Sequence, residues 1–482
     1  MLFNSIEFLI FFPIVIIGYF LLPQKLRKYF LLAASCYFYM SFIPKYILIL
    51  LVTTIVDFGG AVAIDYFNNK GKKKAAIASF VTAVLINVGM LVFFKYLGML
   101  EDTINFFGRT FDMRTVVFPE VVLPIGISFH TFQSMGYLID VYTGKEKVCK
   151  NFIDFALFLM FFPQLVAGPI ERYGNLMGQL KAEHHLTYDN ISAGGRMMLW
   201  GMFKKVVVAD NLAMFADAVF DNVANYSGWG LIVGILCFTV QIYCDFSGYS
   251  DIAIGAARVM DIRLMKNFDT PYFSASTPEF WRRWHISLST WFKDYIYIPL
   301  GGNRVSTPRW CFNQLVTFAV SGIWHGASFT FVLWGLLNGV YIVVSRFVKP
   351  IKDKFYEITR IGKLPRVRRL IGIAITFVMI SLTWVFFRAN TFSDVFYIFA
   401  HLFDSTTMNF THIMHFRHCI APIAVAILFA VDLMSQSEKL KEWYIGSKKS
   451  AQVVRLLSYA FILFVIVVLG AYDNKSFIYF QF

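Results

Sequence analysis

Long apolar runs separated by short polar segments form the main hydrophobic pattern of this chain. A helix that crosses the hydrocarbon core of a bilayer needs about 20 mostly apolar residues. Candidate runs of this kind are 5–22, 29–42, 45–66, 75–97, 118–141, 152–167, 192–220, 228–250, 311–327, 329–346, 370–388, 418–434 and 455–471. Gly or Pro interrupts several of them, so some are expected to be tilted or re-entrant. The pattern predicts an all-α polytopic membrane protein with about 11–13 membrane-embedded helices.

The composition supports the same class. Of the 482 residues, 57% are hydrophobic and 15% are charged, whereas a soluble domain carries about 25% charged residues. The net charge of +14 would suggest nucleic acid in a soluble protein. In a membrane protein such an excess is typical of basic cytoplasmic loops, so membrane lipid is an expected partner and nucleic acid is not.

The positions of the basic residues predict the orientation of the chain. Basic clusters follow alternate spans at 25–28, 70–74 and 145–150, which favours an N-terminus on the outer side. The same rule places 346–369 and 437–449 inside and the C-terminus outside. The first 23 residues lack a basic start and a cleavage site, so they are expected to be a retained membrane helix rather than a signal peptide.

The stretch 251–310 does not fit a simple span, because it mixes basic residues with many aromatic ones. One interpretation is an amphipathic cytoplasmic linker. The other is a set of interfacial helices that line an entrance for an anionic ligand. Composition alone does not distinguish the two.

Two histidines are candidates for chemistry. His325 lies in SGIWHGASF, within a stretch (311–345) that contains no Asp, Glu, Lys or Arg. An ionisable group at membrane depth is costly and tends to face a cavity, and imidazole accepts a proton near pH 7. His285 lies in EFWRRWHISL, beside Arg282 and Arg283. The alternative roles are a buried histidine that joins two helices and an interfacial histidine on a basic helix.

Two carboxylates, Asp245 and Asp251, lie near the end of an apolar span in QIYCDFSGYSDIAIG. They could orient a histidine or cap a helix.

The chain contains no serine-hydrolase elbow, phosphate-binding loop or zinc-protease motif. Its six cysteines are scattered and none forms a C-x-x-C pair. Neither a metal nor a cofactor is expected.

Five blocks in a fixed order carry a family resemblance. They are SFHTFQSMGYLIDVYTG, FFPQLVAGPIERY, QIYCDFSGYSDIAIGAARVMDIRLMKNFDTPY, FWRRWHISLSTWFKDYIYIPLGGNR and SGIWHGASFTFVLWGLLNG. Together they resemble the membrane-bound O-acyltransferase (MBOAT) family, in its bacterial alginate and peptidoglycan O-acetylase branch.

The resemblance implies one membrane domain over 1–482 in the bacterial cytoplasmic membrane, with a helix bundle around a central tunnel. It implies a catalytic core at 118–346, with 251–310 as cytoplasmic-side interfacial helices at the donor entrance. His325 would be the catalytic base and His285 would position the donor. The expected substrate-binding residues are Trp324, Arg282, Arg283, Asp245 and Asp251.

The implied reaction moves an acetyl group from acetyl-CoA to an extracytoplasmic glycan through a partner of the SGNH-type acetyltransferase class. The nearest rival within the family is D-alanyl transfer to teichoic acid. A transporter or flippase is an alternative of another class, which would predict inverted repeats. A structural assembly subunit is a third possibility.

The aromatic tail at 474–482 also has two interpretations. FIYFQF could be an interfacial anchor, since aromatic side chains are enriched at the level of the lipid headgroups. In the D-alanyl system, however, a small separate protein ends in a similar Phe-x-Tyr-x-x-Phe tail, whose tyrosine is thought to accept the acyl group. Phe477, Tyr479 and Phe482 match that spacing. The resemblance therefore suggests Tyr479 as an acyl relay.

Overall fold

The computed structural model covers residues 1–482 and describes all of them except 112–114, 120, 409, 411–414, 447, 473–476 and 479–482. For residues 415–418 it describes only the backbone. The described chain is built from helices and contains no β-strand in these ranges, only an isolated bridge between Ser227 and Thr407.

The helices follow one another along the chain in three groups. The first group is α1 (Ile6–Leu21), α2 (Gln24–Met40), α3 (Ile47–Asn69), α4 (Lys73–Leu91) and α5 (Leu97–Thr110). The second is α6 (Ile127–Tyr142), α7 (Phe152–Met160), α8 (Phe162–Leu165), α9 (Tyr173–Lys181), α10 (Tyr188–Met202), α11 (Asp210–Phe220) and α12 (Trp229–Val259). The third is α13 (Thr277–Arg283), α14 (Ile286–Phe292), α15 (Thr307–His325), α16 (Phe329–Ile358), α17 (Pro365–Arg388), α18 (Phe392–Ala400), α19 (His415–Ser435), α20 (Glu438–Ile445) and α21 (Lys449–Leu469).

Several of these helices are long and apolar enough to cross a membrane. In the described part of the chain six segments qualify: Pro44–Asn69, Lys73–Thr110, Trp229–Val259, Phe329–Ile358, Pro365–Arg388 and Lys449–Leu469. A seventh span is possible if Cys419–Ser435 and Glu438–Ile445, which meet at 97°, form one broken span. The expected class, an all-α polytopic membrane protein, is confirmed.

Three of the expected spans are broken into shorter pieces. The segment 118–141 becomes helical only at Ile127, after Gly126 turns the chain with a φ of 78°. Helices α7 and α8 divide 152–167, and a π-helix at Phe203–Ala209 divides 192–220. An apolar run by itself does not distinguish one crossing helix from two short helices that protein surrounds, so the pattern could not place these breaks.

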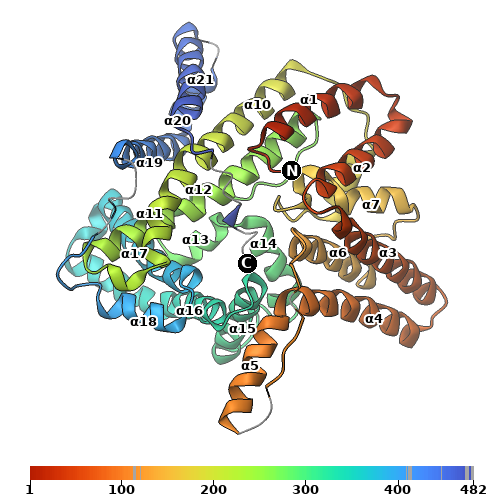
Figure 1. Ribbon diagram of the computed structural model, residues 1–482, viewed down its shortest axis with the longest axis horizontal. Helices are drawn as coiled ribbons and strands as arrows, with labels where there is room; N and C mark the ends of the chain where they lie inside the picture. The colour runs from red at the N-terminus through yellow and green to blue at the C-terminus, as the bar shows by residue number, and fades with distance from the viewer. Residues whose placement is uncertain are drawn as a thin grey trace.

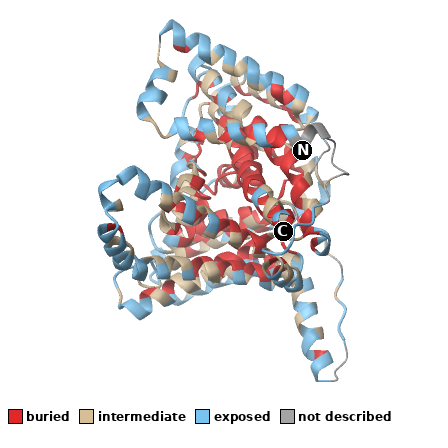
Figure 2. Ribbon diagram, turned by 90° about the vertical axis from the view of Figure 1, so that its left-hand side faces the viewer, coloured by how far each residue is buried: buried red, intermediate tan, exposed pale blue. Residues whose placement is uncertain are grey.

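Helix α12 lies at the centre of the molecule (Figure 1). In its apolar window 78% of the residues are buried, against 11% for α21. Figure 2 shows the buried residues gathered in the middle of the molecule and exposed positions along the outlying helices. Large apolar side chains remain exposed there, such as Leu456 at 70%. Such a surface is suited to lipid rather than to water.

Small residues allow α10 to run directly against α12, as Figure 1 shows. A Cβ on Gly194 would come within 2.5 Å of the carbonyl oxygen of Gly255, and one on Gly201 within 2.6 Å of that of Gly248. The second pair of glycines lies seven residues from the first along each helix. Close backbone contact of this kind is a main source of helix association in membranes.

The stretch 251–310 is folded into this interior over much of its length. Residues up to Val259 continue α12, and α13 and α14 follow as two short helices. Asn267 joins α12 to α14, because its side-chain amide donates to the hydroxyl of Ser250 and its side-chain oxygen accepts from the backbone N–H and the hydroxyl of Ser287. Whether the remaining exposed part faces the cytoplasm stays a prediction.

Two adjacent glycines test the contact between α10 and α12. We expect Gly194→Ala to destabilise the protein by about 1–3 kcal/mol, because the added methyl group overpacks the interface. A Cβ on Gly195 would meet nothing within 4 Å, so Gly195→Ala should be neutral or stabilising by up to about 1 kcal/mol. Thermal unfolding of the purified variants measures both. Equal melting temperatures for the two would contradict this packing.

Candidate active site

His325 is the last residue of α15, where the chain stops being helical inside the protein. Gly326 is extended, with a φ of −162°, and the chain turns directly into α16. Helices α15 and α16 pack closely, since a Cβ on Gly335 would lie 3.1 Å from the Cα of Gly322. This hairpin leaves His325 only 4% exposed.

Aromatic rings surround the imidazole of His325. The ring centroids of Trp324, Trp334 and Phe387 lie 4.8, 4.9 and 5.3 Å from that of His325. They come from α15, α16 and α17, so three helices fix the position of one polar group. Its surroundings exclude bulk water, which strengthens any electrostatic interaction that a bound ligand makes there.

His285 reaches the same region from the junction of α13 and α14. It is 1% exposed and its backbone is left-handed, with a φ of 43°. Such a conformation is uncommon for a residue other than glycine and is often found at functional sites. The ring of His285 lies 4.5 Å from that of Phe246 and 6.1 Å from that of Trp324.

Both histidines line one cavity of about 430 Å³. Aromatic, hydroxyl and cationic side chains share its wall: Trp281, Arg282, Trp284, His285, Ile286, Leu288, Ser289, Thr290, Phe292, Lys293, Tyr297, Gln314, Thr317, Phe318, Ser321, His325 and Ile342. Arg282 and Lys293 are its two cations, and they would favour an anionic ligand.

A second, much smaller cavity of about 30 Å³ lies at His325 as well. Its wall consists of Lys95, 123–129, Val166, Trp324 and His325. Its volume is about that of one water molecule. His325 therefore lines both cavities. This position suits a residue that acts between two ligands.

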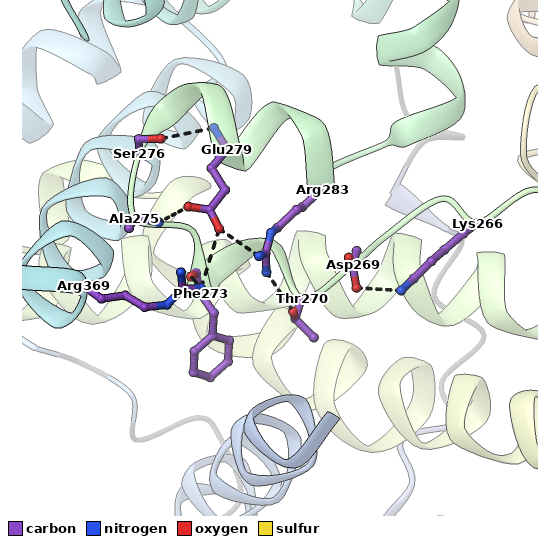
Figure 3. Close-up of polar contacts among 9 residues, drawn as sticks. All are labelled: Lys266, Asp269, Thr270, Phe273, Ala275, Ser276, Glu279, Arg283 and Arg369. Carbon is purple, nitrogen blue, oxygen red and sulfur yellow. Dashed lines mark hydrogen bonds and ion pairs between the residues drawn. The ribbon is translucent and has the colours of Figure 1, made fainter. Parts of the chain in front are cut away.

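Arg282 and Arg283 are adjacent in the sequence, but their side chains have different neighbours. Arg282 is exposed and lines the large cavity. Arg283 instead forms an ion pair of 2.8 Å with Glu279, as Figure 3 shows. Glu279 also accepts from the backbone N–H of Ala275 and lies 3.6 Å from Arg369. The described contacts of Arg283 are therefore structural, whereas Arg282 is available to a ligand in the cavity.

The two candidate aspartates form ion pairs with lysines where α12 packs against the π-helix Phe203–Ala209. Asp245 pairs with Lys205 at 2.5 Å and Asp251 pairs with Lys204 at 2.6 Å. Both lysines belong to the π-helix Phe203–Ala209. Neither aspartate lines the cavity that contains the histidines. Their expected role in substrate binding stays a prediction.

Phe477 and Ile478, the two described residues of the aromatic tail, lie between Asp245 and the ring of Phe246. Tyr479 lies outside the described residues, but Phe477 and Ile478 before it are described and buried. The backbone N–H of Ile478 donates to Asp245 over 2.7 Å. The ring of Phe477 packs 5.6 Å from Phe246, the residue whose ring lies against His285.

Several residues of the site were missed in the sequence. Lys293, Tyr297, Gln314 and Ser321 line the large cavity, and Lys95 lines the small one. Lys293 belongs to the basic stretch 251–310 that was expected at a donor entrance, and Lys95 had a signal as the one charged residue between 75 and 100. Trp324 contributes to the small cavity and packs against both histidines. In the described ranges no three His, Cys, Asp or Glu side chains gather as metal ligands.

The fold and this site together define a polytopic membrane protein with a cavity that two buried histidines line. Comparison with known proteins gives the family: residues 147–389 match the model of the membrane-bound O-acyltransferase family, MBOAT. The chain belongs to this family and is an acyltransferase. The transporter alternative is therefore not supported.

The relatives come from two parts of the family. The chain is 37% identical to the probable alginate O-acetylase of Pseudomonas aeruginosa, over 92% of this chain and 82% of that protein. It is 36% identical to the peptidoglycan O-acetyltransferase of Helicobacter pylori, over 81% and 77% of the two chains. Identity with the teichoic acid D-alanyltransferase of Bacillus subtilis is 24%, over 56% and 69%.

The two arginines provide a test of whether Arg282 binds an anionic ligand in the large cavity. We expect Arg282→Gln to raise the Kd for coenzyme A at least about tenfold, because a contact with a charged group is worth about 1.5–3 kcal/mol. Arg283→Gln should leave that Kd unchanged and lower the melting temperature, since Glu279 loses its closest cation. Isothermal titration calorimetry measures the Kd. A reversed pattern would contradict the assignment.

Proposed function

We propose that this acyltransferase moves an acetyl group from cytoplasmic acetyl-CoA across the membrane for O-acetylation of an extracytoplasmic polysaccharide. The observation that carries the proposal is that His325 lines both the large cavity and the small one. A base in that position can serve a donor in the first space and an acceptor hydroxyl that enters through the second.

His325 acts as the general base. The acceptor oxygen loses its proton to the imidazole and attacks the thioester carbonyl carbon; the C–S bond then breaks, and the departing thiolate takes up the proton. His285 shares the cavity wall and positions the thioester. Aromatic side chains, among them Trp284 and Phe292 at the large cavity and Trp324 at the small one, reduce the access of water that could compete as an acceptor.

The donor is recognised by charge and shape. Coenzyme A carries several phosphate charges, for which Arg282 and Lys293 are suitable partners. The rest of the wall, which combines aromatic and aliphatic side chains with hydroxyl groups, receives the pantetheine arm with its two amides and the acetyl group. This orientation requires 251–310 to face the cytoplasm, with both termini on the outer side of the bacterial cytoplasmic membrane.

The acceptor pathway rests on the relatives. Those named as alginate and peptidoglycan O-acetyltransferases match over 81–92% of this chain, so one of these glycans or another surface glycan is proposed. An SGNH-type partner outside the membrane completes the transfer. D-alanyl transfer to teichoic acid is the second candidate, since the Bacillus subtilis relative matches over 56% of the chain.

Tyr479 is proposed as a relay between the two enzymes. Its neighbours Phe477 and Ile478 are buried beside α12, and Phe477 contacts a ring that touches His285. In this scheme the phenol oxygen attacks the acetyl carbonyl, His325 takes the phenol proton, and the thiol leaves. A hydroxyl of the partner later attacks the tyrosyl ester and releases the phenol.

We expect His325→Ala to reduce acetyl transfer by at least about 10²–10⁴, the usual contribution of a positioned base. The assay is release of coenzyme A from acetyl-CoA by membranes supplied with partner and acceptor. His185→Ala is the matched control, because His185 is exposed and should keep full activity. Normal turnover by a well-expressed His325→Ala protein would contradict the proposal.

We expect Tyr479→Phe to abolish glycan acetylation, because the acceptor oxygen is removed while the ring stays. Mass spectrometry of the C-terminal peptide should detect an acetyl adduct on the wild-type chain and none on this variant. Tyr472→Phe is the control, since Tyr472 is 53% exposed. Full glycan acetylation by Tyr479→Phe would leave the tail as a membrane anchor only.

A further inference from the structure

Two side chains from one short segment cap the end of α15. The hydroxyl of Tyr96 donates to the carbonyl of Ile323 over 2.5 Å. The ammonium of Lys95 donates to the carbonyl of Trp324 over 2.7 Å and to that of His325 over 2.9 Å. Three successive carbonyls of the last helical turn thus receive a donor from a part of the chain about 230 residues away.

This cap supplies hydrogen-bond donors to a helix end that lies inside the protein. The last four carbonyls of an α-helix have no partner within the helix. At the protein surface, water would donate hydrogen bonds to these carbonyls. Helix α15 instead ends among buried aromatic rings. A cation is favourable there for a second reason, because the helix dipole places partial negative charge at the C-terminal end.

Burying the charge of Lys95 at membrane depth also costs free energy. It belongs to the span Lys73–Thr110, and it sits in the π-helix Val92–Tyr96 that separates α4 from α5. The structure describes no carboxylate paired with it; its described partners are the two carbonyls. Ionisable residues at membrane depth commonly mark function, and π-helical turns are frequent at functional sites.

We propose that Lys95 is a positioning residue for His325: its ammonium fixes the last peptide of α15 and with it the imidazole between the two cavities. This inference rests on the proposed catalytic role of His325. Lys95 lies at the small cavity and contacts the peptides of Trp324 and His325, not the large donor cavity. It should therefore act on the rate of the chemical step rather than on donor binding.

The mechanism of the effect is loss of alignment. Without the ammonium the carbonyls of Trp324 and His325 lose the donor that Lys95 supplies, and the helix end can relax toward other polar groups. A displacement of about 1 Å of a catalytic group can cost about 10² in rate. The indole of Trp324, which lies 5.9 Å from the ammonium, would lose its cation at the same time.

The experiment compares Lys95→Met, Lys95→Arg and Tyr96→Phe in the full-length protein in membranes with partner and acceptor. We expect Lys95→Met to lower kcat by about ten- to a hundredfold with an unchanged KM for acetyl-CoA. Lys95→Arg keeps a cation with several donors and should recover most of the lost kcat. Tyr96→Phe removes only the donor to the carbonyl of Ile323, two residues before His325, so it should lower kcat less than Lys95→Met does.

Other outcomes overturn the inference. A normal kcat for Lys95→Met, or a change in KM alone, would show that Lys95 does not align His325. If Lys95→Met does not accumulate, Lys95→Gln replaces it: an intermediate kcat supports positioning, and a wild-type kcat contradicts it. Activity of His325→Ala would instead refute the proposed function, so the two failures are distinguishable.

Discussion

The end of α15 inside the protein is the constraint on which the rest of the site depends. A helix that stops among apolar side chains presents carbonyl groups that need donors, and here the last of them belongs to His325 itself. The protein meets this need with Lys95 and Tyr96. Stopping the helix there puts an imidazole at the boundary of two cavities, which a continuous membrane helix could not do.

The surrounding fold keeps that arrangement rigid. Glycines draw α15 against α16 and α10 against α12, and rings from three helices enclose His325. The ion pairs of Lys204 with Asp251 and of Lys205 with Asp245 fix the π-helix Phe203–Ala209 against α12, and Asp245 also accepts from the backbone N–H of Ile478. Both helix packing and charge pairs therefore hold the helices around the site.

The class of protein and the position of His325 at a buried cavity could be predicted from the sequence, because both are local signals. Apolar runs indicate helices in a membrane, and a histidine in an uncharged stretch is conspicuous by itself. The breaks at Gly126 and at the π-helix Phe203–Ala209 depend on tertiary packing and could not. Adjacent arginines look alike in sequence, yet the packing of α13 sends only Arg282 to the cavity. Lys95 meets His325 across about 230 residues, a distance that no local pattern encodes.

The claim at the centre of this account is that the cavity shared by His285 and His325 holds the thioester during transfer. A structure of the full-length protein in a lipid nanodisc with a non-reactive thioether analogue of acetyl-CoA tests it most directly. We predict the acyl carbon within about 3–3.5 Å of the space that an acceptor oxygen would occupy beside His325, with phosphates at Arg282. An analogue bound with its acyl end outside this cavity would contradict the account.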